Sequence, residues 1–518
     1  MYAQFKKCSQ CITQGKLYVK FYSDNVTKCQ IKTDNRQPRP FSDIPGPKSL
    51  PIIGTLYKYL PFIGEYSFTK MYDSGKKKLK QFGPLVREEI LPNVNVVWIY
   101  RPEDIAEIFK AESGLHPERR SHLALLKYRK DRKDLYNTGG LIPTNGPEWW
   151  RLRKEFQKVT SKPQDVINYL QETDRVVQEF VDLCASEKFV DFLPILSRLF
   201  LELTCLVVFD VRLNSFSKEE RRENSRSSKL IEAAFTTNSV ILKLDNGLQL
   251  WHFFETPLYR KLRKAQTYME MVALELVSLK KTDIKKGHNK SFLNAYFKNP
   301  ALDIKDIIGM ACDMLLAGID TTTYSTAFTL YHLAKNQDIQ EKLRSEAMQL
   351  LVHRNQPITA DVLRNASYTK AVIKESLRLN PISIGIGRIL QTDVVLNDYY
   401  IPKGTVVVTQ NQIISRLPEY FDKPDTFIPE RWLREHSESN IKVNYGKSVH
   451  PFVVLPFGHG PRSCIARRFA EQNMQVLLLR LCQQLKFSWL GGELGMISLL
   501  INKPNEPLKF AFHEIKKI

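Results

Sequence analysis

Residues 456–470 read Pro456-Phe-Gly-His-Gly-Pro-Arg-Ser-Cys-Ile-Ala-Arg-Arg-Phe-Ala470 and carry the strongest signal in the chain. Two glycines and a proline predict a tight loop, and Cys464 follows it at the start of an apolar-periodic helix. Helix N-termini stabilise thiolates through the dipole and unpaired N–H groups. We therefore expect a deprotonated Cys464 that binds a metal, with Arg462 able to pair with an anionic cofactor group. The alternative for a lone cysteine is a small buried apolar side chain.

The pattern Phe457-Gly-x-Gly-x-Arg462-x-Cys464 resembles the haem-binding loop of the cytochrome P-450 family, and the resemblance covers about residues 43–515. It implies a mainly α fold with small β-sheets, with haem b between a long central helix and the helix of the cysteine loop. It also implies that Cys464 is the axial ligand and that Phe457 and Arg462 contact the cofactor. Ala466 stands where the family usually has glycine, and we expect only mild crowding there.

Two further motifs follow the order of the family. Glu375-Ser-Leu-Arg378 places an acid and a base one helical turn apart, which by itself is a common i,i+3 pair. Pro429-Glu-Arg-Trp432 supplies Arg431. The resemblance implies a buried network of Glu375, Arg378 and Arg431 that is structural and not catalytic.

Arginines are expected to neutralise the two propionates of the haem. Gly146-Pro-Glu-Trp149-x-x-x-Arg153 resembles the propionate-binding Trp-x-x-x-Arg helix of the family, and Gly387-Arg388 resembles another propionate site. Arginine suits this role because its planar fork meets a carboxylate with two hydrogen bonds. The residues implied are Trp149, Arg153, Arg388 and Arg462.

A long helix is predicted from Asp303 to Asn336, and its centre, Ala317-Gly-Ile-Asp-Thr-Thr-Thr323, forms helix poorly. We therefore expect an interruption at the centre. The run resembles the oxygen-binding groove of the family, where small residues admit dioxygen, a threonine hydrogen-bonds the oxygen being activated and an acid relays protons. A threonine within a helix otherwise bonds back to a carbonyl. The residues implied are Ala317, Gly318, Asp320 and Thr321.

Other segments are assigned from pattern alone. The apolar run from Phe192 to Phe209 carries Arg198 and Glu202 four apart, which predicts a buried helix with an ion pair on one face, not a transmembrane helix. The stretch from Leu248 to Val277 interleaves aromatic and basic residues, so it either rests on a membrane interface or is a half-buried helix. Polar composition predicts loops at 214–229 and 282–291, and alternation predicts strands at 393–396, 399–401 and 405–409.

The chain has 518 residues and a net charge of +21. Eight widely spaced cysteines are too few for a disulfide scaffold and indicate a reducing compartment. The basic charge raises nucleic acid as a partner, but no zinc-finger, RNP or basic-zipper pattern is present. We therefore expect no nucleic acid as a partner, and the same charge can attract an acidic protein or an anionic membrane.

The first forty residues hold eight Lys and Arg against two Asp, and the remainder still carries +15. A basic leader without a continuous apolar segment is typical of a mitochondrial presequence, and a disordered basic tail is the alternative. A Pro/Gly elbow, Asp43-Ile-Pro-Gly-Pro-Lys48, precedes the folded body. We expect a targeting leader at 1–40, one haem-thiolate monooxygenase domain at 41–518, and a location on the matrix side of the inner membrane. Cys8 and Cys11 have no second pair that would indicate a metal site.

Electrons must come from outside, because the chain has no flavin or iron–sulfur motif. Lys370-Ala-Val-Ile-Lys374 places two lysines on one helical face, similar to the docking lysines of the mitochondrial class of the family, and Arg467-Arg468 adds positive charge nearby. The resemblance implies an acidic mitochondrial ferredoxin, with its reductase, as the partner. The alternative is a solvated basic face. The docking residues implied are Lys370, Lys374, Arg467 and Arg468.

Two longer stretches, 116–129 and 136–143, resemble the arthropod mitochondrial ecdysteroid hydroxylases, and the segment 56–64 agrees with the disembodied type of that group. The resemblance implies hydroxylation of a steroid by dioxygen, at C22 of an ecdysteroid precursor, with peripheral membrane contact. Three alternatives stay open: another sterol position or a lipid or xenobiotic substrate, a non-catalytic haem-binding sensor, and a basic nucleic-acid-binding protein.

Overall fold

The computed structural model of this protein describes residues 37–515 except 113, 115, 286–291 and 434–448. Residues 40–518 form one compact unit, and the preceding unit, 1–39, lies almost wholly outside the described residues. The predicted leader up to residue 36, with Cys8 and Cys11, is therefore outside the described part. The predicted mainly α fold with small sheets is confirmed.

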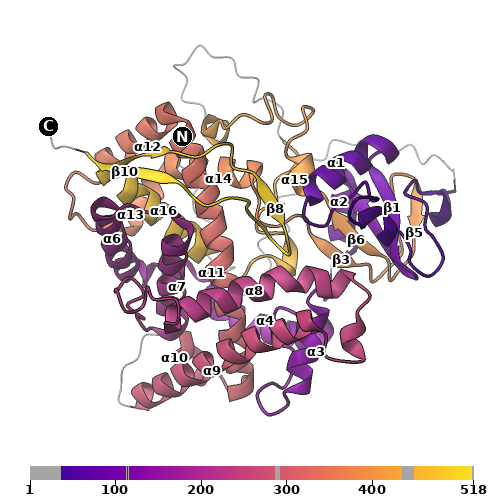
Figure 1. Ribbon diagram of the computed structural model, residues 1–518, viewed down its shortest axis with the longest axis horizontal. Helices are drawn as coiled ribbons and strands as arrows, with labels where there is room; N and C mark the ends of the chain where they lie inside the picture. Colours follow the sequence, from indigo (N-terminus) through magenta and orange to yellow (C-terminus); the bar gives the residue numbers. More distant parts are fainter. Residues whose placement is uncertain (1–36, 113, 115, 286–291, 434–448, 516–518) are drawn as a thin grey trace, which may run out of the picture. The chain divides into compact units, whose positions relative to one another are not determined.

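The helices surround one long central helix, α11 (Figure 1). In chain order they are α1 (Met71–Phe82), α2 (Pro102–Ala111), α3 (Leu123–Asp131), α4 (Gly146–Thr160), α5 (Pro163–Ile167), α6 (Leu170–Ser186), α7 (Leu193–Phe209), α8 (Arg226–Asn246), α9 (Pro257–Lys285), α10 (Phe292–Phe297), α11 (Ile304–Lys335), α12 (Gln337–Leu350), α13 (Ala360–Asn365), α14 (Ser367–Leu379), α15 (Asn411–Ile414) and α16 (Arg467–Gln484).

The largest sheet has the strand order β1-β2-β6-β3 and lies beside α1 and α2 at the right of Figure 1. Strand β6 pairs with β2 in parallel and with β3 antiparallel. The other strands form two-stranded sheets. The bounds are β1 (Leu85–Leu91), β2 (Val94–Ile99), β3 (Gly387–Ile389), β4 (Val394–Leu396), β5 (Tyr399–Ile401), β6 (Val406–Thr409), β7 (Leu485–Trp489), β8 (Met496–Ser498), β9 (Asn502–Pro504) and β10 (Phe510–Glu514).

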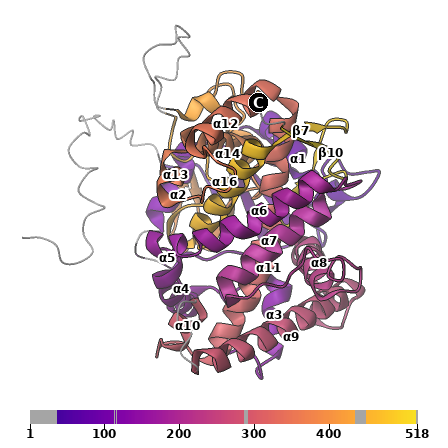
Figure 2. The ribbon, with the colours of Figure 1, turned by 90° about the vertical axis from the view of Figure 1, so that its left-hand side faces the viewer.

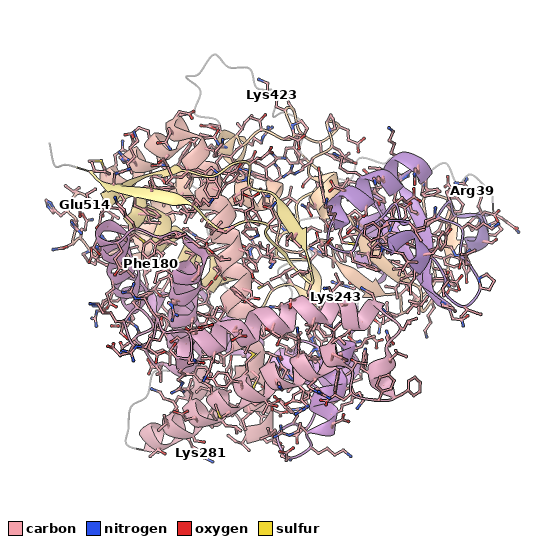
Figure 3. All side chains as sticks on the ribbon, in the orientation of Figure 1. Arg39, Phe180, Lys243, Lys281, Lys423 and Glu514 are labelled. Carbon is pink, nitrogen blue, oxygen red and sulfur yellow. The ribbon has the colours of Figure 1, made fainter. Side chains whose placement is uncertain are left out.

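The three predicted strands are confirmed as β4, β5 and β6, within one residue at their starts. The β1–β2 hairpin was missed, although its residues alternate and Asn93 forms its turn in the left-handed region at φ 65°. The largest core cluster lies between helices, and Phe180 of α6, labelled in Figure 3, is fully buried there. Figure 2 shows α6 and α7 running side by side over α11.

The expected interruption of the central helix is wrong, because α11 is one α-helix of 32 residues. Its hydroxyls bond back to the preceding turn: Thr321 Oγ1 donates to the Ala317 carbonyl at 2.6 Å and Thr323 Oγ1 to the Ile319 carbonyl at 2.6 Å. A capping box of Asp303 and Asp306 fixes the first turn. Burial of this helix among its neighbours outweighs the low helix propensity of glycine and threonine.

The predicted ion pair within α7 is also wrong, although the helix is buried as expected. Arg198 donates to the carbonyls of Ser215 and Glu220. Glu202 pairs with Arg212 at 2.7 Å. The connection between α7 and α8 supplies these partners. Both charged side chains of α7 therefore bind this connection and do not pair with each other.

The predicted loop at 214–229 holds only to Ser225, whose side chain caps the first turn of α8. The predicted loop at 282–291 is wrong for its first residues, because α9 continues to Lys285, and 286–291 lie outside the described residues. In the part of the chain that the structure describes, no helix combines the length and apolar character needed to cross a bilayer.

Candidate functional site

The cysteine loop closes on itself through backbone hydrogen bonds. The Cys464 N–H donates to the Phe457 carbonyl at 2.8 Å, and the Ser463 N–H donates to the Gly460 carbonyl at 3.0 Å. Gly458 and Gly460 have φ of +73° and +70°, which side chains with a Cβ rarely adopt. The loop therefore requires its two glycines. Helix α16 begins three residues after the cysteine, at Arg467, and not at the cysteine itself.

Cys464 is exposed in this structure. Desolvation raises the pKa of its thiol, against the N–H of Ala466 and the charges of Arg153 and Arg467, which lower it. The donor beside the helix terminus thus acts in the predicted direction. A bound metal ion would stabilise the thiolate further. Ala466 has φ −100°, so alanine fits this backbone without strain.

Four arginines influence one another beside this loop: Arg119, Arg153, Arg388 and Arg462. Burial, followed by the charges of Arg119, Arg388 and Arg153, lowers the pKa of Arg462 to about 8. Burial is also the first cause that lowers the pKa of Arg119 to about 10 and that of Arg153 to about 10. We call these residues the arginine cluster. Arg119 and Arg462 are half-buried. Glu112 and Glu118 offset part of the charge. Like charges this close destabilise one another unless further anions lie among them.

The arginine cluster keeps hydrogen-bond donors free. Nε and Nη1 of Arg462 and Nε of Arg119 have no hydrogen-bond partner among the residues that the structure describes. Arg388 forms one ion pair, 2.7 Å from Glu112. Buried donors in native proteins are normally satisfied, so the cluster is short of acceptors. The two carboxylates of a porphyrin have the charge and the acceptor oxygens that this site needs, and the residues present therefore fit haem.

Two of the residues predicted to bind the propionates, Trp149 and Arg153, also contact other side chains of the protein. The Trp149 ring lies under the guanidinium of Arg462, 4.3 Å from ring centre to Cζ. Arg153 Nε donates to Gln157 of the same helix at 2.8 Å. Trp149 is therefore placed to orient Arg462 as well as to meet a cofactor.

Sequence reasoning missed Arg119 as a site residue. Its Nη2 donates to the carbonyl of Ile142, and its backbone N–H donates to Asn145 Oδ1 at 3.2 Å. Arg119 lies in the quoted stretch 116–129, but no periodicity distinguishes it from the neighbouring Arg120. Only the folded chain shows that it belongs to the cluster.

The groove residues of α11 point in different directions. Ala317 is exposed and shares a face with the half-buried Thr321, one turn later. A Cβ on Gly318 would lie 2.7 Å from Thr204 Oγ1 of α7. Gly318 is therefore required by the close packing of α7 on α11, a role that the sequence did not reveal. The Thr321 hydroxyl donates to the Ala317 carbonyl of its own helix, which is the alternative role expected for a threonine within a helix.

Asp320 is fully buried, and Asn238 Nδ2 of α8 donates to its Oδ2 at 2.9 Å. Burial raises the pKa of this carboxyl to about 8, against the hydrogen bond from Asn238 and the charge of Lys503, which lower it. At neutral pH the group therefore holds a proton. A buried acid with a pKa near neutrality can both give and take protons.

Glu375 accepts hydrogen bonds from three directions. Arg378 donates to both of its oxygens, at 2.8 and 2.9 Å, and Arg431 Nε donates to Oε1 at 3.1 Å. Trp432 and the backbone of Ile428 complete the shell. The structure thus brings together the three residues of the expected network, all of them buried. These bonds connect α14 to the segment around Pro429–Trp432 (η4).

Two of the four predicted docking residues lie on α14 and two at the start of α16. Lys370 Nζ donates to the Arg364 carbonyl at 2.8 Å, and Lys374 lies 5.9 Å from the centre of the Trp432 ring. Arg467 pairs with Glu471 at 3.0 Å, and Arg468 is exposed. Burial lowers the pKa of Lys370, as do Lys374 and Arg364, while Glu346 and Glu471 raise it. Lys370 thus responds to charges on both α14 and α16, and we call the surface that carries these four basic residues the basic face.

The family model for cytochrome P450 matches residues 44–510, and the chain belongs to this family. It is 49% identical over 477 residues to the protein named cytochrome P450 302a1, mitochondrial, of Drosophila melanogaster, covering 91% of this chain and 94% of that one. It is 32% identical to probable cytochrome P450 12a5, mitochondrial, of the same species, over 95% of both chains. It is 31% identical to ecdysone 20-monooxygenase, also of that species, over 87% of this chain and 85% of the relative. The predicted family is confirmed, with mitochondrial members among the relatives.

Proposed function

We propose that this protein is a mitochondrial haem-thiolate monooxygenase that hydroxylates a steroid, at C22 of an ecdysteroid precursor. The observation that carries the haem assignment is the arginine cluster, four buried or half-buried arginines beside the Cys464 loop, of which Arg119 and Arg462 keep donors without a partner among the described residues. The steroid class is supported by the named relative ecdysone 20-monooxygenase, and the mitochondrial location by the relatives whose names include it. The carbon atom rests on the resemblance of the stretches 116–129 and 136–143.

The roles of the residues follow from their placement. Cys464 would ligate the iron of haem b, Phe457 would contact the cofactor, and the arginine cluster with Trp149 would hold the propionates. When bound, a thiolate-ligated haem supplies the oxidising chemistry, with the thiolate favouring O–O cleavage. Asp320 carries the proton that this cleavage consumes.

Thr321 would pass that proton on, with Ala317 leaving room for dioxygen beside it. In the observed state Thr321 donates to the Ala317 carbonyl. Its hydroxyl can exchange this bond for one to oxygen by a rotation about χ1, and the carbonyl is still satisfied by the helix backbone. Thr321 thus acts by turning, without a break in α11.

An acidic ferredoxin, kept reduced by its reductase, would deliver the electrons at the basic face. The charges lie on α14, which carries Glu375, and at the start of α16, which follows the cysteine loop. The residues are Lys370, Lys374, Arg467 and Arg468. A surface of one sign steers a partner of the opposite sign and loses strength with salt.

Contact with a membrane surface, proposed here as the matrix side of the inner membrane, is supported by two exposed apolar segments. Ile52, Phe62 and Ile63 are exposed in the segment before α1, and Phe253 and Phe254 are exposed between α8 and α9. Large aromatic side chains that face solvent at loop tips are typical of membrane contact. Basic residues such as Lys261 and Lys264 follow on α9.

The test is an optical titration of the purified protein, residues 37–518, with 22-deoxy ecdysteroid precursors. We expect a haem-thiolate spectrum that shifts from low to high spin, followed by a 22-hydroxylated product when reduced ferredoxin is added. A spectrum without a shift would redirect the search to another sterol position or lipid. A shift without turnover would favour a haem-binding sensor, and absence of haem would reopen the assignment of Cys464.

A further inference from the structure

Asp320 and Thr321 are adjacent in sequence, yet their side chains leave α11 on different sides. Asp320 is fully buried toward α8, whereas Thr321 is half-buried on the face of Ala317. Oδ2 of Asp320 accepts from Asn238, and Oδ1 has no hydrogen-bond partner among the residues that the structure describes. The two oxygens of this carboxyl therefore have different surroundings.

Helix α8 is held firmly over this part of α11. It crosses in front of α11 in Figure 1, and Lys243 marks its outer side in Figure 3. The rings of Phe235 on α8 and Tyr324 on α11 lie 5.5 Å apart. Asn238 is itself buried one turn after Phe235. The position of Asn238 against Asp320 is thus set by the packing of the two helices.

A protonated carboxyl has one oxygen that accepts and one that donates. Because an amide N–H donates to Oδ2, and the carbonyl oxygen of a neutral carboxyl is the better acceptor, this bond favours the proton on Oδ1, the oxygen without a partner among the described residues. The charged or titratable groups that act on this carboxyl are Lys503 of β9 and Tyr324 of α11, besides the amide of Asn238. None of them is hydrogen-bonded to Oδ1.

We propose that Asn238 is a positioning residue that holds Oδ2 of Asp320 as the accepting oxygen and so directs the acidic proton to Oδ1. This inference rests on the proposed function, in which Asp320 supplies the proton for oxygen activation. When the Oδ1–H bond breaks, the proton leaves toward the active site and the electron pair stays on the carboxylate. The bond from Asn238 is then charge-assisted and holds the carboxylate until a solvent proton replaces the lost one. Asn238 contacts neither substrate nor cofactor and acts through Asp320.

The experiment compares Asn238→Leu, which keeps the volume but loses the donor, with Asn238→Gln, which keeps an amide. Ser239→Ala is the matched control, because within the described residues the Ser239 hydroxyl donates to the Thr236 carbonyl of its own helix. We expect Asn238→Leu to lower product formed per oxygen consumed by roughly 3- to 10-fold, the factor that one hydrogen bond provides. Asn238→Gln should recover part of this loss, and Ser239→Ala should behave as the parent protein.

Two further readouts separate positioning from a general loss of structure. Removal of a bond that favours the carboxylate raises the pKa of Asp320, so the fall in turnover at high pH should move up by about one pH unit in Asn238→Leu. Infrared difference spectra, with Asp320→Asn as the reference, should show the same shift in the titration of the protonated carboxyl band. In the Asp320→Asn background, Asn238→Leu should add no further loss of coupling.

An unchanged high-pH limb and carboxyl band in Asn238→Leu would overturn the proposal, as would losses that multiply in the double variant. Failure of the proposed function looks different. In that case the parent protein itself lacks a haem-thiolate spectrum or fails to consume oxygen when reduced, before any variant is compared.

Discussion

Arg119 and Arg462 are held by the same short segment of backbone. Arg119 Nη2 donates to the Ile142 carbonyl and Arg462 Nη2 to the Thr144 carbonyl. Asp313 of α11 fixes this segment by accepting the N–H of Ile142 at 3.0 Å. The central helix thus helps to set the positions of two guanidinium groups through the backbone segment that accepts their hydrogen bonds.

Arg119→Gln is expected to weaken haem retention, because it removes one of the cationic groups that a propionate would meet. Loss of a charge-assisted hydrogen bond should speed the transfer of haem to an excess of an acceptor protein by about tenfold. Arg120→Gln is the matched control, since Arg120 points to Asp245 and Asn246. Equal haem retention in the two variants would show that Arg119 does not contribute to haem binding.

Glu375→Gln should be strongly destabilising. The change removes the negative charge between two buried guanidinium groups, and such a loss costs about 3–5 kcal/mol of unfolding free energy. Urea unfolding followed by circular dichroism measures it. The exposed pair Arg364–Asp361 provides a control, because Asp361→Asn should change stability by less than about 1 kcal/mol.

Gly318→Ala tests the close contact between α7 and α11. The added Cβ would meet Thr204 Oγ1 at 2.7 Å, and overpacking of this kind costs about 1–3 kcal/mol. Thr204→Ala removes the opposing atoms and should restore much of the stability in the double variant. If Gly318→Ala is as stable as the parent protein, packing against α7 does not require glycine. The requirement would then come only from the space that dioxygen needs.

The dependence of stability on pH should report the proton on Asp320. Because burial raises its pKa to about 8 from the ordinary 3.8, the folded state binds a proton that the unfolded state has lost across this range. Its contribution to stability is thus present below the unfolded value and is lost as the pH rises toward about 8. Between pH 4 and 8, the fall in the free energy of unfolding should be smaller in Asp320→Asn than in the parent protein by a few kcal/mol. Unfolding curves at stepped pH test it, and equal slopes would contradict the buried neutral acid.

Charge reversal at Lys370 and Lys374 tests the basic face. At low ionic strength, ferredoxin-supported turnover should be at least about tenfold lower in the Lys370→Glu, Lys374→Glu double variant than in the parent protein. The difference should shrink as salt is added. Lys486→Glu on β7 is a control with the same kind of charge change away from α14. A turnover that is unaffected at low salt would place the electron donor elsewhere.

Local motifs predicted the fold class, the cysteine loop and the acid–arginine pair of α14, because each depends on residues close in sequence. The continuity of α11 could not be predicted, since the packing of α7, α8 and α9 decides it. Arg119, Asn238 and Thr204 were missed for a similar reason. Each acts on a residue far away in the chain, and nothing in its immediate neighbours marks it.

The arginine cluster also bears on how the protein is made. Its members come from four separate places in the sequence, and Arg462 lies far along the chain from Arg119 and Arg153. A nascent chain therefore exposes Arg119 and Arg153 long before Arg462 leaves the ribosome. A cofactor held by all four arginines can be captured only after Arg462 has been synthesised. Before that point, the positive charges of the arginine cluster have no cofactor to neutralise them. The incomplete chain must therefore keep these arginines apart.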